Sequence, residues 1–219
     1  MLGRTANDLF WLSRYVERAE NMARLIEAGY RIALLPRIGD DRGREWASTL
    51  ESAGCAEAYH AKHGEISTRN VVDFLLFDAS NPSSIHACLA AARRNARAQR
   101  TALTREMWES LNGSWLEFQT IRPGTLRSDA LPRILDWVKE RSAGYRGAML
   151  NTILRNDTFY FSQLGTFLER ADNTARILDV SLQSITEDAS LDPVDSCAGV
   201  YGIFGVTDVP AEDLTVQRV

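Results

Sequence analysis

The chain has 219 residues, of which 45% are hydrophobic and 25% charged, a composition typical of a globular domain rather than a disordered segment. Its net charge of −4 argues against a general nucleic-acid binder, and no apolar run reaches the roughly 20 residues of a membrane-spanning helix, so we expect neither a nucleic-acid nor a membrane partner. Cys55, Cys88 and Cys197 form no even disulfide framework and no Cys-x-x-Cys zinc pair, which indicates a reducing, cytoplasmic compartment.

Helical periodicity dominates the first part of the chain. Apolar residues spaced three and four apart predict a long helix over residues 5–35, capped by Thr5 and ended by Pro36. Shorter helical segments are expected over residues 41–54, 55–63 and 67–77. The last of these begins after a capping residue, Ser67 or Thr68.

The same pattern continues to residue 178. Asn81-Pro82 is a helix start signal for a segment that runs to Leu103, and Thr104 is expected to open the next helix. Two longer helices are predicted, over residues 129–153 and from residue 157 onward. No convincing pair of strands precedes Asp192-Pro193, so the fold class is predicted to be all-α, an antiparallel helical bundle with modest loops.

A segment of 13 residues occurs twice in the chain. Residues 15–27 and 167–179 share six identical positions at a constant offset of 152 residues. The identities are Glu17/Glu169, Arg18/Arg170, Ala19/Ala171, Asn21/Asn173, Ala23/Ala175 and Arg24/Arg176. A common amphipathic pattern explains the shared apolar residues but not the shared charged ones, so we interpret the segments as products of a duplication. The offset is too long for a solenoid period and indicates two halves.

The duplicated polar residues form a stripe on each predicted helix, because Glu17, Asn21 and Arg24 are spaced by four and three. If the helices cross antiparallel at their alanines, Glu17 is expected near Arg176, and Glu169 near Arg24. The stripe is then a buried ionic clamp, a polar pocket for a carboxylate or phosphate ligand, or a set of exposed ion pairs. Its members are Glu17, Arg18, Asn21, Arg24, Glu169, Arg170, Asn173 and Arg176.

A second group of cations follows the Asn81-Pro82 start signal. Arg93, Arg97 and Arg100 lie on one helical stripe, which is typical of a solvated face or of a surface for an anion or acidic partner. Aromatic residues do not interleave with these arginines, which argues against nucleic-acid binding there.

Metal and cofactor sites find little support in the sequence. Glu57 and His60 have the Glu-x-x-His spacing of di-iron bundles, with His63 nearby, but no second such pair exists. The chain contains no P-loop, no Gly-x-Ser-x-Gly elbow and no dinucleotide fingerprint. We therefore expect no metal, no cofactor and no catalytic activity of the chain on its own.

Five segments of the chain resemble the bacterial alpha-E domain family. They are residues 1–21 (MLGRTANDLFWLSRYVERAEN), 81–85 (NPSSI), 92–97 (ARRNAR), 106–112 (EMWESLN) and 168–172 (LERAD). The resemblance implies a mostly helical protein encoded beside a circularly permuted ATP-grasp protein and a transglutaminase-like protease, in a peptide-synthesis or peptide-modification system. It supplies no established catalytic residue.

The resemblance and the repeat together predict the domain organisation. We expect an alpha-E-like helical domain over residues 1–195, with a first repeat near 1–130 and a partial second repeat near 157–195. Residues 196–219 have no helical period and are expected to form an irregular tail, typical of a truncation or a shifted reading frame.

The function expected from the sequence is that of an accessory, binding component of an ATP-grasp-linked system. Its partners would be the ATP-grasp-type ligase and the transglutaminase-like protein. Two alternatives stay open at this point. One is an amide-forming or amide-cleaving enzyme that uses Glu17 or Glu169 as acid or base, and the other is a self-associating structural protein that forms a homo-oligomer.

Overall fold

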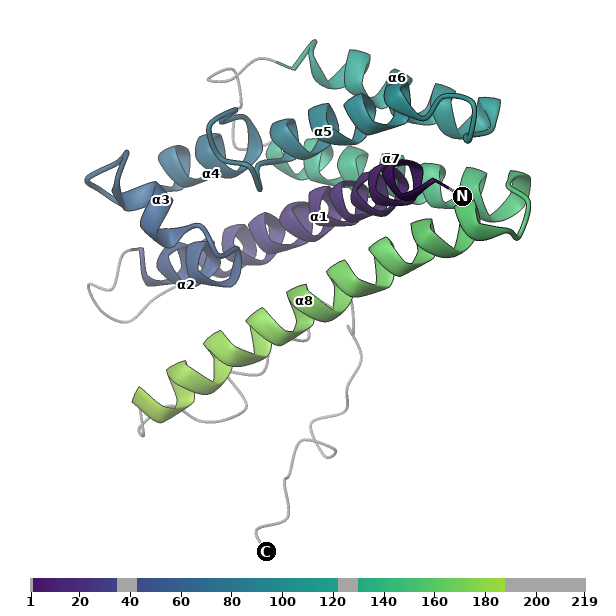
Figure 1. Ribbon diagram of the computed structural model, residues 1–219. Coiled ribbons are helices and arrows are strands. Elements are labelled where there is room, and N and C mark those ends of the chain that lie inside the picture. The colour runs from purple at the N-terminus through teal and green to yellow at the C-terminus, as the bar shows by residue number, and fades with distance from the viewer. Residues whose placement is uncertain (1, 35–42, 122–129, 188–219) are drawn as a thin grey trace, which may run out of the picture.

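The described residues of the computed structural model, 2–34, 43–121 and 130–187, form eight helices and no strand (Figure 1). The helices are α1 (Gly3–Ala33), α2 (Arg44–Ser52), α3 (Ala56–His60), α4 (Thr68–Leu76), α5 (Ile85–Ala98), α6 (Arg105–Phe118), α7 (Leu131–Thr152) and α8 (Asp157–Glu187). The predicted all-α class is confirmed. The predicted tail and the domain boundary at residue 195 lie outside the described residues.

Capping residues fix several of the helix starts. Ser67 accepts a hydrogen bond from the backbone of Asn70 at the start of α4, and the Thr104 hydroxyl accepts one from Met107 at the start of α6. Both caps follow the sequence prediction, because each hydroxyl satisfies a backbone N–H that the first turn of a helix leaves unpaired.

Two predicted start signals are wrong. The helix α1 begins at Gly3, before Thr5. Ser84, not Asn81, caps α5, because the buried Asn81 side chain instead donates to the carbonyl of Phe74 and accepts from the N–H of Ser83. Asn81 thus holds the turn between α4 and α5 together rather than opening a helix.

The central element of the bundle is α1. It contacts α8 on one side and α5 and α7 on the other, while α6 lies on the outside of α5 and α7 (Figure 1). The apolar residues of α1 that face this layer are fully buried, including Leu9, Leu12, Ala23 and Ile26. The stripe of α1 that faces α8 is polar, so the two sides of this helix form different kinds of interface.

The two repeated helices run parallel, so the predicted antiparallel crossing is wrong. In Figure 1, α1 and α8 start at the same end of the molecule, and Gly165 lies beside Phe10 while Glu169 lies beside Arg14. The reason is topological. The helix α7 runs antiparallel to α1, because Arg146 contacts Glu17 whereas the earlier Lys139 contacts the later Glu27, and the short turn before α8 reverses the chain again.

Small side chains let α8 lie close to α1. Ser162, Gly165 and Thr166 are buried on the face of α8 that meets α1. A Cβ atom added at Gly165 would lie far inside the van der Waals distance of the Phe10 carbonyl oxygen, which belongs to rigid helical backbone. The close approach of the two backbones therefore requires glycine at this position.

We expect Gly165→Ala to lower the free energy of unfolding, by about 1–3 kcal/mol, because overpacking against backbone forces the helices apart. Gly147→Ala in α7 is the matched control, since nothing lies within 4 Å of a Cβ added there. It should raise stability by up to about 1 kcal/mol, the usual gain for alanine in a helix interior. Urea unfolding measures both, and an equal gain from the two variants would contradict the close contact.

Candidate functional site

Two glutamate–arginine pairs join α1 to α8. Glu169 accepts from Arg18 through Nε at 2.6 Å and Nη2 at 3.0 Å. Glu17 accepts from Arg170 through Nε at 2.6 Å and Nη2 at 3.4 Å. The two glutamate side chains are only 4% and 5% exposed, so both carboxylates depend on these guanidinium groups in place of water.

The pairing is reciprocal, as the sequence predicted, but the predicted arginines are wrong. Arg176 and Arg24 instead pair within their own helices, with Asp172 and Glu20 respectively, four residues earlier. In parallel helices related by a local two-fold axis, each glutamate meets the arginine that follows the other glutamate. The antiparallel assumption placed the contact about six residues too far along.

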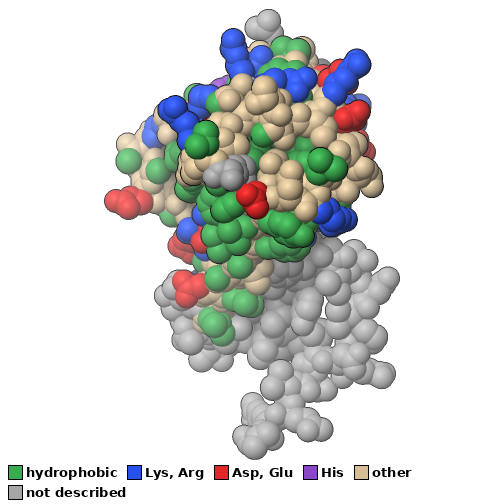
Figure 2. All heavy atoms as spheres, turned by 45° about the vertical axis from the view of Figure 1, so that its right-hand side comes forward, with side chains coloured by type: hydrophobic (Ala, Val, Ile, Leu, Met, Phe, Trp, Pro, Cys, Tyr) green, Lys and Arg blue, Asp and Glu red, His purple; other side chains and the backbone are tan. Residues whose placement is uncertain are grey.

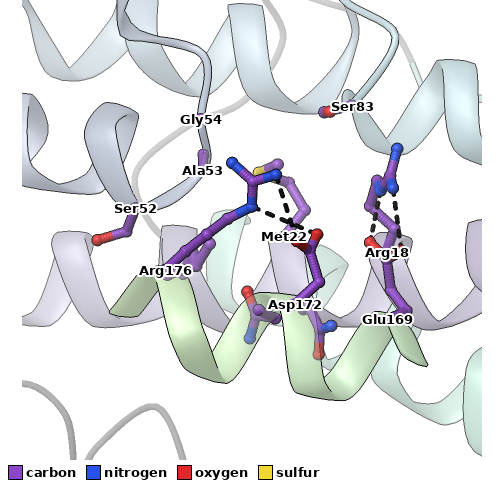
Figure 3. Close-up of a pocket in the computed structure, with 12 residues that line it drawn as sticks. Arg18, Met22, Ser52, Ala53, Gly54, Ser83, Glu169, Asp172 and Arg176 are labelled. Carbon is purple, nitrogen blue, oxygen red and sulfur yellow. Dashed lines mark hydrogen bonds and ion pairs between the residues drawn. The ribbon is translucent and has the colours of Figure 1, made fainter. Parts of the chain in front are cut away.

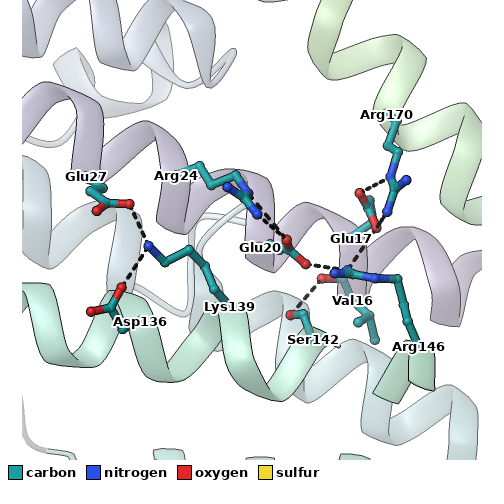
Figure 4. A network of polar contacts seen from close by, with 10 residues as sticks. All are labelled: Val16, Glu17, Glu20, Arg24, Glu27, Asp136, Lys139, Ser142, Arg146 and Arg170. Carbon is teal, nitrogen blue, oxygen red and sulfur yellow. Dashed lines mark hydrogen bonds and ion pairs between the residues drawn. The ribbon is translucent and has the colours of Figure 1, made fainter. Parts of the chain in front are cut away.

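Two further arginines contribute to the charge balance of this network, and Figure 4 shows one of them, Arg146. Arg14 lies on α1 one turn before Arg18 and donates to Glu169 at 2.6 Å. Arg146 reaches from α7 to both Glu17 and Glu20. The sequence analysis missed both arginines. Helical spacing could have revealed Arg14, whereas no sequence signal indicates that a residue of α7 reaches this stripe.

The environment of Glu20 shows how the network favours charged carboxylates. Burial alone would raise the pKa of this side chain, but the hydrogen bonds and charges of Arg146 and Arg24 outweigh burial and lower the pKa below its ordinary value. Glu20 is therefore ionised at neutral pH and held in place by two guanidinium groups. A carboxylate in this state is a poor general base.

The two glutamate–arginine pairs, Glu169 with Arg18 and Glu17 with Arg170, are called the clamp below. A cavity of about 100 Å³ lies beside the clamp, between α1, α8 and the end of α2 (Figure 3). It draws five residues of the predicted stripe together, which are Arg18, Asn21, Glu169, Asn173 and Arg176. Glu17, Arg24 and Arg170 do not line it. The remaining lining residues, which the sequence analysis missed, are Met22, Leu25, Ser52, Ala53, Gly54, Ser83 and Asp172.

The cavity offers donors and acceptors from both repeats. The Asn21 Nδ2 atom is buried and finds no hydrogen-bond partner in the described part of the chain. On the opposite wall, Arg176 forms long hydrogen bonds of 3.3 and 3.4 Å to Asp172, and its guanidinium extends toward Gly54 (Figure 3). A Cβ at Gly54 would lie 2.7 Å from Arg176 Nη1, and φ there is +64°, so glycine both permits this turn and leaves room for the arginine.

The cysteines near this cavity are unsuited to nucleophilic chemistry. Complete burial raises the pKa of Cys88 to about 12, despite the nearby charge of Arg18. Burial also raises the pKa of Cys55. Both thiols therefore stay protonated at neutral pH, and a protonated thiol is a weak nucleophile.

The second predicted cation group does not line the cavity between α1 and α8. Arg93 is half-buried because its Nε donates to Asn112 of α6 at 2.9 Å. Arg97 is exposed, and Arg100 lies beyond the end of α5 with its guanidinium over the ring of Trp108. Their role as a surface for an anion or acidic partner stays a prediction.

The histidines serve as packing partners in this fold. His60 and His63 lie against Tyr59, with the ring of His63 stacked at a centroid distance of 4.8 Å. His86 packs against Trp115 and Phe118. Across the described residues, no three His, Cys, Asp or Glu side chains group closely enough to hold a metal ion. Likewise, none of the described helices is long and apolar enough to cross a lipid bilayer.

Comparison with known families adds one finding. Residues 1–199 match the Alpha-E family, described as a predicted alpha-helical domain with a conserved ER motif. The chain belongs to the Alpha-E family. The clamp of this Alpha-E chain is built from two Glu-Arg dipeptides, Glu17-Arg18 and Glu169-Arg170. Searches of curated proteins and of solved structures each found no significant match.

We expect Glu169→Gln to lower the free energy of unfolding by about 3 kcal/mol, because it leaves the largely buried Arg18 without a counter-charge and leaves Arg14 with only its 3.7 Å contact to Asp172. The matched control is Glu109→Gln, which removes a pair to Arg105 with the same 2.6 Å distance. Glu109 is 56% exposed, so its loss should cost less than about 1 kcal/mol. Chemical denaturation measures both values, and indistinguishable losses would show that the clamp is not a buried structural contact.

Proposed function

We propose that the protein is an accessory, ligand-binding component of an ATP-grasp-linked peptide synthesis or modification system in the bacterial cytoplasm. Membership in the Alpha-E family supports the helical domain. The ATP-grasp-type ligase and the transglutaminase-like protein are the partners that the family resemblance suggests. The protein would bind the amino acid or peptide, and the ligase would supply the chemistry of ATP.

The cavity between the repeats is the observation that carries this proposal. The lining of the cavity includes a guanidinium and two amides, from Arg176, Asn21 and Asn173, which suit a carboxylate. Asp172 on the same rim suits an ammonium group. A free amino acid carries both charges on groups bonded to one carbon atom, and a peptide carries one of them at each end. A volume of about 100 Å³ accommodates such a small charged group.

The arrangement favours binding over catalysis. A carboxylate that works as acid or base must reach the substrate, yet Glu17 and Glu169 each contact two arginines. Glu17 does not line the cavity. By contrast, Arg176 is half-exposed, and its long contacts with Asp172 can be exchanged for contacts with a ligand.

Co-purification with an ATP-grasp-type ligase, the partner that the family resemblance suggests, tests the proposed complex. We expect a stable complex, followed by ATP turnover that rises when L-amino acids or dipeptides are added. No complex, together with ATP turnover that the helical protein does not change, would contradict the proposal.

Arg176→Gln tests the cavity within that assay. We expect it to weaken the response to the amino acid or dipeptide about tenfold while leaving complex formation intact, since one charge-assisted hydrogen bond contributes roughly 1.5 kcal/mol. The control is Arg105→Gln, which breaks the same kind of i,i+4 pair on an exposed face. Equal behaviour of the two variants would exclude the cavity as the binding site.

A further inference from the structure

An exposed apolar stripe runs along α8, on the side away from α1. Four leucines of this stripe are between 46% and 62% exposed, and two exposed alanines lie between them. The stripe consists of Leu164, Leu168, Ala171, Ala175, Leu178 and Leu182. Figure 2 shows hydrophobic side chains gathered on the lower part of the described surface, at the height where α8 lies. Contiguous exposed apolar surface of this kind marks an interaction site.

The corresponding residues of the first repeat indicate that this stripe packs against another helix. At the offset of 152 residues, Leu182 corresponds to the partly buried Tyr30, and the other five members correspond to Leu12, Val16, Ala19, Ala23 and Ile26 of α1. All five of these residues are buried in α1. They face the layer that contains α5, which runs antiparallel to α1 because Gln99 at its end bonds to Asp8 near the start of α1. The described part of the chain holds no helix in the corresponding place on α8.

The spacing of the residues in the stripe indicates which helix packs against it. Successive residues are four, three, four, three and four apart, a heptad pattern that reads the same in both directions. When two copies of α8 lie antiparallel, Ala171 of one faces Ala175 of the other, Leu168 faces Leu178, and Leu164 faces Leu182. The alanines at the centre allow the backbones to approach, and the leucines on either side meet one another.

The size and composition of the surface agree with this pairing. No charged side chain belongs to the stripe, and with the flanking Tyr160, Phe161 and Phe167 it presents roughly 700 Å² of apolar surface per copy, near the ~800 Å² per partner of a stable interface. The sequence of residues 196–219 has no helical period that would match α5. A second copy of this chain fits the stripe.

We propose that the protein forms a two-fold symmetric dimer through antiparallel packing of α8 on α8. The partner helix then occupies on α8 the place that α5 occupies on α1. The dimer leaves the charged clamp and the cavity, which lie on the opposite side of α8, free for a ligand. This inference stands independently of the proposed function.

Light scattering coupled to size-exclusion chromatography tests the dimer with the full chain. We expect a mass of about 49 kDa, twice the 24.5 kDa of one chain. Leu168→Glu places a charge in the stripe and should give a monomer with unchanged helical circular dichroism. Leu116→Glu is the control, because Leu116 is 52% exposed on α6, away from the stripe, and this variant should remain dimeric. Wild-type protein of single-chain mass at every concentration overturns the proposal.

Disulfide cross-linking tests the antiparallel register and does not depend on the stability of Leu168→Glu. Leu168→Cys and Leu178→Cys are made separately, each with Cys197→Ser, since Cys55 and Cys88 are buried. Mixing the two variants under oxidation should produce a linked dimer, because the facing positions come within disulfide range. Each variant alone should stay unlinked, since its two cysteines would lie about 15 Å apart along the helix. Linkage of each variant alone, or none in the mixture, overturns this register.

Discussion

The structure depends on two carboxylates that are buried between parallel helices and neutralised by arginines of the opposite helix, with Arg146 of α7 also contacting Glu17. Glu17 and Glu169 have almost no access to water, so separating α1 from α8 by even a small shift would strand charges in the interior. A slide of one turn would break the Glu-Arg contacts between α1 and α8, because every carboxylate must meet a particular guanidinium. The clamp thus fixes the register of the two helices.

The sequence predicts much of this arrangement, and the features that it does not predict have physical causes. The offset of 152 residues predicts that α1 and α8 meet through their charged stripes, because unrelated amphipathic helices need not share glutamate, asparagine and arginine. The relative direction of α1 and α8 was predicted wrongly because a stripe of side chains has the same spacing in either orientation of the helix. Direction is set by the number of chain reversals between the helices. Arg146 and Gly54 were missed since their places depend on tertiary packing.

The two faces of α8 have opposite character. Its inner face is built from Ser162, Gly165, Thr166 and Glu169, which bring it close to α1 and carry the clamp. Its outer face carries the leucines that, in the first repeat, correspond to buried core positions. The cavity lies along the inner face and is lined by asparagines and arginines of the repeated stripes together with Asp172. The polar face of α8 thus contacts α1 within the same chain, and the apolar face remains exposed for the proposed association with a second copy.

A double-mutant cycle on Arg18 and Glu169 tests the central claim most directly. The free energy of unfolding is measured for Arg18→Gln, for Glu169→Gln and for the double variant under identical conditions. If the two side chains form the buried contact that fixes α8 on α1, the coupling energy should be at least about 1.5 kcal/mol. Losses that add to within about 0.4 kcal/mol would mean that the two residues do not interact, and the clamp would not hold these helices together.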